Sequence, residues 1–239
     1  QTPEYAMLRS LVGSEMCIRD RIANFDEDVR TAISVESLTM DYGIPGSPEG
    51  HINGVDIEME KITQKFEHHR DIVFLPNFKT FDIEQRFVKY EHQEYETKKT
   101  FAAVDLGQQI FSLQGKFTGE DRTLGSLIQY RKFVAGGFYW TPDTDEINIS
   151  IFGFREKEFN FITVQASTRL EFLTIKPETT TLSSVNLDQD QIKERNFYYG
   201  SYALSFFRNW QNWKMSSSLM LLQLSLIHIS EPTRLLSSA

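Results

Sequence analysis

The apolar residues between Gln109 and Trp140 change their spacing partway along this stretch. They first alternate with polar residues, which is the two-residue period of a strand, and then recur at intervals of three and four, which is the period of a helix. The alternating positions are Phe111, Leu113, Gly115 and Phe117, and the later positions are Leu124, Leu127, Ile128, Arg131 and Val134. The spacing therefore predicts strand, turn, helix and strand, with a short helix at about 123–135.

Turn-forming residues stand at both ends of the predicted helix. Gly119, Glu120 and Asp121 form the expected turn, and Asp121 or Thr123 is a candidate N-cap. Gly136 and Gly137 can adopt the left-handed backbone that ends a helix before the next extended run.

Later strands are indicated by a second series of alternating residues. Ile147, Ile149 and Ile151 alternate with Asn148, Ser150 and Phe152. The charged run 155–158 is expected to connect this strand to the next, and a third strand is expected to end before Pro177. The predicted fold class is α+β and β-rich: an antiparallel sheet or sandwich with the one short helix packed on it.

The two ends of the chain look like translated library DNA. Residues 224–234, LSLIHISEPTR, and residues 11–21, LVGSEMCIRDR, are readings of opposite strands of one short DNA that resembles a transposase adapter for sequencing libraries. We therefore expect 1–21 and 224–239 to be artefacts and the remainder to be a fragment. The remainder divides into a β-rich domain, 22–177, and an aromatic C-terminal segment, 178–223.

Composition narrows the function classes. The net charge is −8, with 33 acidic and 25 basic residues, and the expected artefacts contain four of each. Without a basic stripe, we expect neither nucleic acid nor membrane as a partner. No native run approaches the length of a transmembrane helix. The single cysteine, Cys17, lies in the adapter-like part, so no native thiolate site is expected.

Candidate chemical sites are few, and we expect no catalytic residue, no cofactor and no metal. Adjacent His68 and His69 point to opposite faces of a strand, which does not suit a zinc site. Glu156, Glu158 and Glu171 could form a carboxylate pair for glycoside hydrolysis. A possible contact surface is instead formed by aromatic residues: Tyr139, Trp140, Tyr198, Tyr199, Trp210 and Trp213.

The central segment resembles the N-terminal region of distal tail and baseplate proteins of tailed phages. The residues that carry the resemblance are Leu113, Gly115, Phe117, Gly119, Asp121, Arg122, Leu127, Gly136 and Gly137. The family implies a structural role for them and assembly into rings with further copies and other tail proteins, in a virion. The alternatives are a carbohydrate-binding β-sandwich and a two-carboxylate glycoside hydrolase; an enzyme is the less expected class.

Overall fold

The fold is a single antiparallel sheet of ten strands. The structure is a computed structural model that describes residues 13–44, 54–96, 101–137, 141–178, 192–209 and 213–224. The strands are β1 (Gly13–Phe25), β2 (Val29–Ile44), β3 (Val55–Asp71), β4 (Thr80–Glu96), β5 (Val104–Thr118), β6 (Arg122–Gly137), β7 (Thr144–Phe159), β8 (Ile162–Pro177), β9 (Arg195–Asn209) and β10 (Lys214–Leu224).

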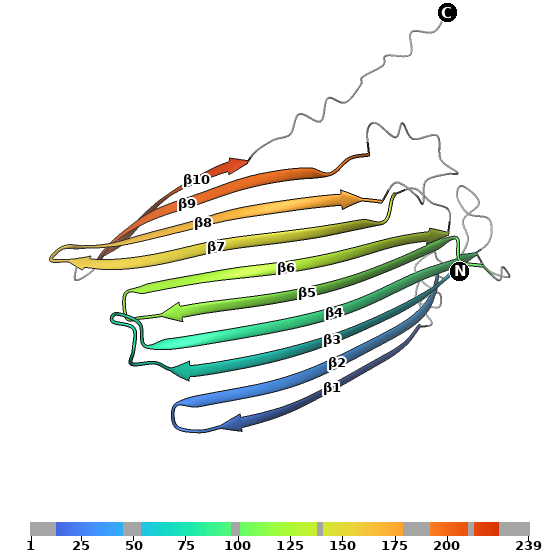
Figure 1. Cartoon of the computed structure of the whole chain (residues 1–239), viewed down its shortest axis with the longest axis horizontal. Helices are drawn as coiled ribbons and strands as arrows, with labels where there is room; N and C mark the ends of the chain where they lie inside the picture. Colours follow the sequence, from blue (N-terminus) through green and yellow to red (C-terminus); the bar gives the residue numbers. More distant parts are fainter. Residues whose placement is uncertain are drawn as a thin grey trace, which may run out of the picture.

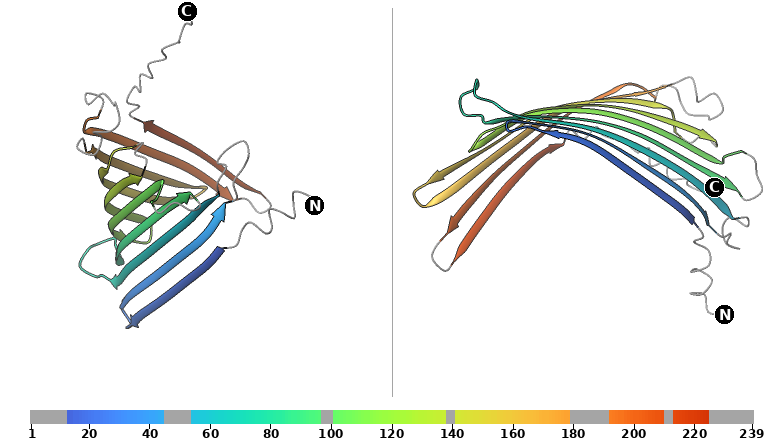
Figure 2. Two further views of the ribbon diagram at one scale, coloured as in Figure 1. Left: turned by 90° about the vertical axis from the view of Figure 1, so that its right-hand side faces the viewer. Right: turned by 90° about the horizontal axis from the view of Figure 1, so that it is seen from below.

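Each strand pairs with the next strand in the sequence, so the spatial order is the chain order from β1 to β10 (Figure 1). The sheet is bent into an arch (Figure 2). Strands β1 and β10 form its two edges, and the described sheet does not close on itself. It runs without interruption across the domain boundary predicted at 177/178.

Strict alternation of side chains gives the sheet two different faces. Ile149 lies opposite Ile128 of β6 and opposite Phe172 of β8, so these three side chains share one face. We call this the apolar face. Following the register across the sheet adds these exposed apolar residues: Met16, Ile18, Ile22, Ile33, Val35, Phe111, Leu113, Leu124, Tyr130, Val134, Ile147, Ile151, Leu170, Tyr198, Tyr202, Leu204, Met215, Leu219 and Leu221.

Although Glu58, Glu60, Arg70, Lys89 and Glu91 of β3 and β4 point to the apolar face, slightly more than half of the charged and amide side chains of β3–β8 point to the opposite side, which we call the polar face. Its residues are less exposed than their neighbours in sequence: Ile128 of the apolar face is 48% exposed, whereas Gln129 and Arg131 are half-buried. Side chains on the concave side of a bent sheet converge and shield one another. We therefore assign the polar face to the concave side of the arch shown in Figure 2.

No second layer covers the sheet within the described residues. The buried apolar residues there are Ala32, Ile57, Ile72 and Ala135. The accessible surface is 18366 Å², whereas a compact monomer of this mass exposes about 11,000 Å². The described part of the chain also contains no helix long and apolar enough to cross a membrane.

The helix predicted at about 123–135 is wrong, and with it the α+β class: β6 occupies this stretch and the described chain is all-β. Leu124, Ile128 and Val134 all lie on the apolar face of a strand, and the helical spacing arose by adding Leu127 and Arg131, which lie on the polar face. Asp121 and Thr123 consequently cap no helix.

The antiparallel sheet and the turn at Gly119–Asp121 are confirmed. The strand predicted around Ile149 is also confirmed as part of β7. The charged run 155–158 is not the connection expected, because it continues β7, and the turn falls at Asn160 and Phe161. Residues 155–158 are the charged end of a long strand and not a loop.

Gly125 provides a test of the register between β6 and β7. It lies opposite Phe152, and a methyl group at Gly125 would stand 2.8 Å from Cε2 of that ring and 2.9 Å from the carbonyl oxygen of Gly115. We expect Gly125→Ala to lower the free energy of unfolding by about 1–3 kcal/mol through overpacking. Denaturant titration followed by circular dichroism measures the loss.

Gly153→Ala is the matched control, because the nearest atom to an added methyl group there is 3.8 Å away. Equal effects of the two substitutions would contradict the close approach of Phe152 to Gly125.

Candidate functional site: charged side chains on the polar face

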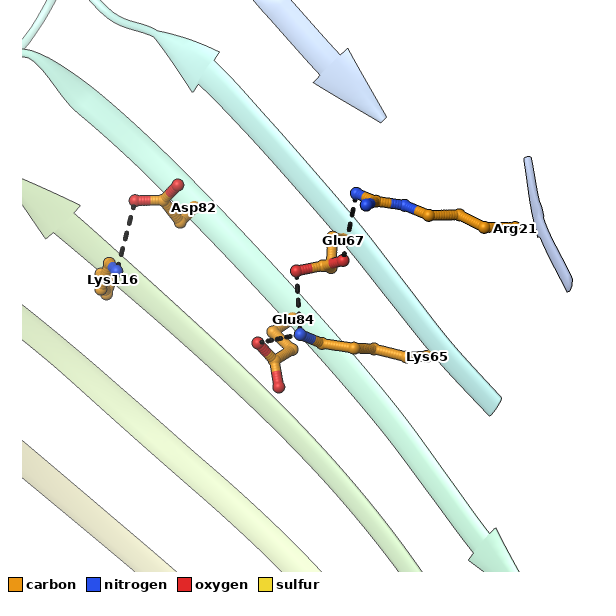
Figure 3. Close-up of polar contacts among 6 residues, drawn as sticks. All are labelled: Arg21, Lys65, Glu67, Asp82, Glu84 and Lys116. Atoms are coloured by element: carbon orange, nitrogen blue, oxygen red, sulfur yellow. Dashed lines mark hydrogen bonds and ion pairs between the residues drawn. The ribbon is translucent and has the colours of Figure 1, made fainter. Parts of the chain in front are cut away.

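A network of opposite charges crosses β3 and β4 on the polar face. The Lys65 ammonium lies 2.8 Å from Oε1 of Glu67 and 3.2 Å from Oε2 of Glu84 (Figure 3). Lys65 and Glu67 are two residues apart and so share a face, and Glu67 lies directly opposite Glu84. One ammonium thus separates two carboxylates that would otherwise repel each other.

Asp82 is the centre of a second group of charged side chains, near the connection between β3 and β4. Its Oδ2 lies 3.8 Å from the Lys116 ammonium (Figure 3). Its Oδ1 lies 2.6 Å from Nδ1 of His69, and Nε2 of that ring lies 3.4 Å from Asp71. His69, Asp82 and Lys116, from the neighbouring strands β3, β4 and β5, form part of the wall of an open hollow with a volume of about 340 Å³.

Arg21 of β1 also reaches this network, with its guanidinium 3.8 Å from Glu67 (Figure 3). It is the last residue of the segment that we attribute to adapter DNA. Without Arg21, Lys65 still lies between Glu67 and Glu84, and Lys116 lies beside Asp82.

The carboxylates of the network outnumber its cations, and the charges are in part hydrated. The hydrogen bond to Glu67 raises the pKa of Lys65 above its ordinary value; Glu84 adds to the rise, and burial opposes it. The Lys65 side chain keeps 33% of its surface exposed, so each pair contributes little more than a surface ion pair does. The network fixes the positions of these side chains on the polar face.

The residues of the predicted turn and of the strand before it lie in two places. Gly119 donates a backbone hydrogen bond of 2.8 Å to the carbonyl oxygen of Arg122, and the Arg122 guanidinium donates to both oxygens of Asp121 at 2.7 and 3.0 Å. Those side-chain hydrogen bonds lower the pKa of Asp121. Gly115 and Phe117 lie on the apolar face of β5, where Phe117 stacks on Phe81 with ring centres 4.6 Å apart.

The other predicted structural residues lie elsewhere on β6. Leu127 points to the polar face rather than into a helix–sheet contact. Gly136 and Gly137 end the strand, and Gly137 has φ 81°, the left-handed backbone that the sequence predicted, although it ends a strand and not a helix.

The predicted aromatic surface is not a single surface. Tyr198 is 68% exposed on the apolar face beside Phe172, with ring centres 5.0 Å apart, whereas Tyr199 lies on the polar face. Trp213 is 77% exposed next to β10. Tyr139, Trp140 and Trp210 lie outside the described residues.

The histidine pair has the geometry expected for a strand. His68 lies on the apolar face with its Nδ1 3.0 Å from Oγ1 of Thr31, and His69 lies on the polar face. Among the described residues, no three His, Cys, Asp or Glu side chains form a group that could hold a metal ion.

The three candidate glutamates all lie on the polar face. Glu156 lies opposite Gln165, and Glu171 lies opposite Ser150. This register separates Glu156 from Glu171 by six residues along the strands, about 20 Å at the usual rise. Glycosidase pairs need about 5–9.5 Å. Glu171 is bound instead by Asn148 and Arg169, at 2.7 and 2.9 Å.

Sequence reasoning missed the charged network. Its signal was present as charges at every second position, Lys65 with Glu67 on one strand and Asp82 with Glu84 on the next. Once 55–71 is taken as one strand, that spacing places the charges on one face.

No family model matches the chain, and no curated protein matches it. The solved structure of the copper transporter OprC is similar to it, with a TM-score of 0.63 and 11% sequence identity. The similarity covers 87% of this chain and 36% of the transporter chain. This chain therefore spans about a third of that protein, and the likeness concerns the fold alone.

The Lys65 network gives a pH-dependent prediction. Because the pKa of Lys65 is raised in the folded chain, its charge stabilises the fold below the unfolded lysine pKa of about 10.4 and stops doing so as the pH rises through the folded value. We expect Lys65→Gln to reduce the free energy of unfolding by about 0.5–1 kcal/mol near neutral pH. Denaturant titrations at several pH values should show the difference narrowing above about pH 10.5.

Lys65→Arg keeps the charge and serves as the control, with a smaller loss expected. A loss for Lys65→Gln that is the same at pH 7 and pH 11 would show that the lysine acts through packing rather than through charge.

Proposed function

We propose that this chain forms part of the wall of a transmembrane β-barrel, with the apolar face against lipid and the polar face toward a water-filled interior. The observation that carries the proposal is the exposed apolar face of β1, β2 and β5–β10, which has no protein cover within the described residues. It continues over β3 and β4 through half-buried residues: Ile62, Phe66, Phe81, Ile83 and Phe87. An apolar surface of this extent is costly in water and is the normal outer surface of a barrel in a bilayer.

The dimensions of the apolar face fit a bilayer. On β6 this face carries no charged residue between Arg122 and Lys132, and on β7 it carries none between Asp145 and Arg155. Arg122 lies opposite Arg155 and Lys132 opposite Asp145, so the two limits continue from strand to strand. Each span between these limits contains nine residues, and its charged members, Arg131 and Glu146, lie on the polar face. A tilted transmembrane strand needs about 9–11 residues.

The connections differ in length at the two ends of the strands. At one end they contain three, eight, three, two and four residues, in order from β1–β2 to β9–β10. At the other end they contain ten, seven, six and seventeen. Bacterial outer-membrane barrels have short periplasmic turns and longer outer loops. On this proposal, the end with the Gly119–Asp121 turn faces the periplasm.

Aromatic and other apolar side chains stand at the short-turn end, where a barrel meets the headgroups. Phe25 is 69% exposed beside the first turn, Phe74 is 76% exposed in the second, and Phe161 is 68% exposed in the turn after β7. Trp213 stands in the last of these connections. Aromatic girdles of this kind mark membrane interfaces.

A barrel wall also requires strands beside β1 and β10, because hydrocarbon cannot satisfy the hydrogen bonds of an open edge. The similarity to part of a larger transporter chain supports such an arrangement. The similarity gives no information about a substrate of this chain.

Spin labels on adjacent residues test the proposal directly. In a Cys17→Ser background, labels at Ile128→Cys and Gln129→Cys stand on the apolar and polar faces of β6. With the full chain in liposomes, we expect the label at 128 to be relaxed mainly by lipid-soluble oxygen and the label at 129 mainly by a water-soluble nickel chelate. Power-saturation electron paramagnetic resonance measures both accessibilities.

A second matched pair, Ile149→Cys and Asn148→Cys on β7, should repeat the alternation. Equal accessibility within each pair, or a folded chain that does not float with liposomes, would count against a barrel wall.

The uncovered apolar face also supports a second proposal, in which other protein chains cover it, as assembly into a phage tail or baseplate would require. That proposal predicts oligomers in the absence of lipid and detergent. Sedimentation of residues 22–223 checks this, and a strictly monomeric species at high concentration contradicts it.

A further inference from the structure

A groove on the polar face of β3–β6 is lined by cations and no acids, in contrast to the acid-rich network beside it. Its polar lining consists of Lys61, Arg86, Tyr90, Gln108, Ser112 and Gln129, and it encloses about 410 Å³. The register places Tyr90 opposite Lys61 and opposite Gln108, and Ser112 opposite Arg86 and opposite Gln129, so these side chains share the polar face. Such a volume suits a small solute.

The two cations of the groove have no carboxylate partner within the described residues. Lys65 and Lys116, the other lysines on the polar face of β3–β5, each lie within 4 Å of a carboxylate. No ion pair involves Lys61 or Arg86 in this part of the chain, and no acidic side chain lines the groove. The groove therefore carries two positive charges that nothing in the described structure neutralises.

The nearby carboxylates are already bound to other cations. Glu84 shares Lys65 with Glu67, and Glu146 lies against Arg131. Glu36 of β2 lies 3.6 Å from Arg19, a residue of the adapter-like segment. Repulsion between unneutralised cations favours the entry of an anion, and the surrounding wall of protein strengthens the attraction relative to open water.

The rest of the lining can bind an organic anion. The Ser112 hydroxyl and the amides of Gln108 and Gln129 supply hydrogen-bond donors on the strands next to the cations. Val88 and Ile110, opposite each other on β4 and β5, provide an apolar floor for a carbon skeleton.

The cations are spaced for two acidic groups rather than one. Lys61 lies opposite Tyr90, and Arg86 is four residues from Tyr90 on the same strand. The two Cα atoms are thus offset by about 13 Å along the strands, a span that the long side chains can shorten.

We propose that this groove binds small organic anions with two or more acidic groups, through Lys61 and Arg86. The inference rests on the proposed function only in placing the groove inside a barrel, where it would select anionic solutes. Carboxylate and phosphate anions share the required chemistry, since both accept charge-assisted hydrogen bonds from lysine and arginine.

Binding is tested with the full chain refolded in detergent micelles, by calorimetric titration with citrate and, separately, with pyrophosphate. We expect the wild-type chain to bind at least one probe, with citrate alone indicating a carboxylate site and pyrophosphate alone a phosphate site. Lys61→Gln and Arg86→Gln should each weaken binding about tenfold, and the double variant should abolish it.

Lys89→Gln is the matched control, because Lys89 is on the same strand as Arg86 but on the apolar face, 2.7 Å from Glu91. It should leave the affinity unchanged. Absence of binding by a wild-type chain with the circular dichroism of a sheet, or undiminished binding by the double variant, overturns the inference. Liposome flotation in parallel tests the barrel wall separately, since a chain that inserts but does not bind anions refutes the groove alone.

Discussion

Backbone pairing of neighbouring antiparallel strands is the constraint on which this structure depends. Each strand pairs with the next in unbroken register, so every second side chain must lie on the same face across the sheet. A single layer built in this way has two faces that must each find a solvent. One solvent cannot satisfy both, because Ile147, Ile149 and Ile151 lie on one face while Asn148 and Ser150 lie on the other. The proposed membrane location follows from this difference.

The same alternation explains the chemistry of the polar face. Lys65, Glu67 and Glu84 are held on adjacent strands at distances set by the sheet, which places one ammonium between two carboxylates without a buried core. The groove at Lys61 and Arg86 is formed in the same way by side chains of adjacent strands, but no acidic side chain lines it. Whether the polar face binds a solute thus depends on which charges lack a partner, because the number of charges alone does not distinguish the two regions.

The sequence predicted the parts of the sheet in which a single face is apolar. On β7 the isoleucines alternate with polar residues, and the strand follows from period alone. On β6, Leu127 and Phe133 place apolar groups on the polar face, and the mixed pattern was read as a helix. The expectation of no membrane partner rested on the missing basic stripe and the missing long apolar run, and neither criterion detects a transmembrane strand. The groove could not be predicted, because it depends on which strands are neighbours.

The alternation of apolar and polar side chains also bears on the origin of the adapter-like segment. Residues 13–21 are paired with β2, but backbone hydrogen bonding at a sheet edge is nearly independent of side-chain identity, so pairing is weak evidence of origin. Side chains are a stronger criterion. Asp20 lies opposite Val35 on the apolar face, in line through the register with Phe87, Phe111 and Ile147. A carboxylate at that depth would oppose insertion into lipid. On the proposed membrane location a native first strand would carry an apolar residue there, and the origin of this segment in adapter DNA stays a prediction.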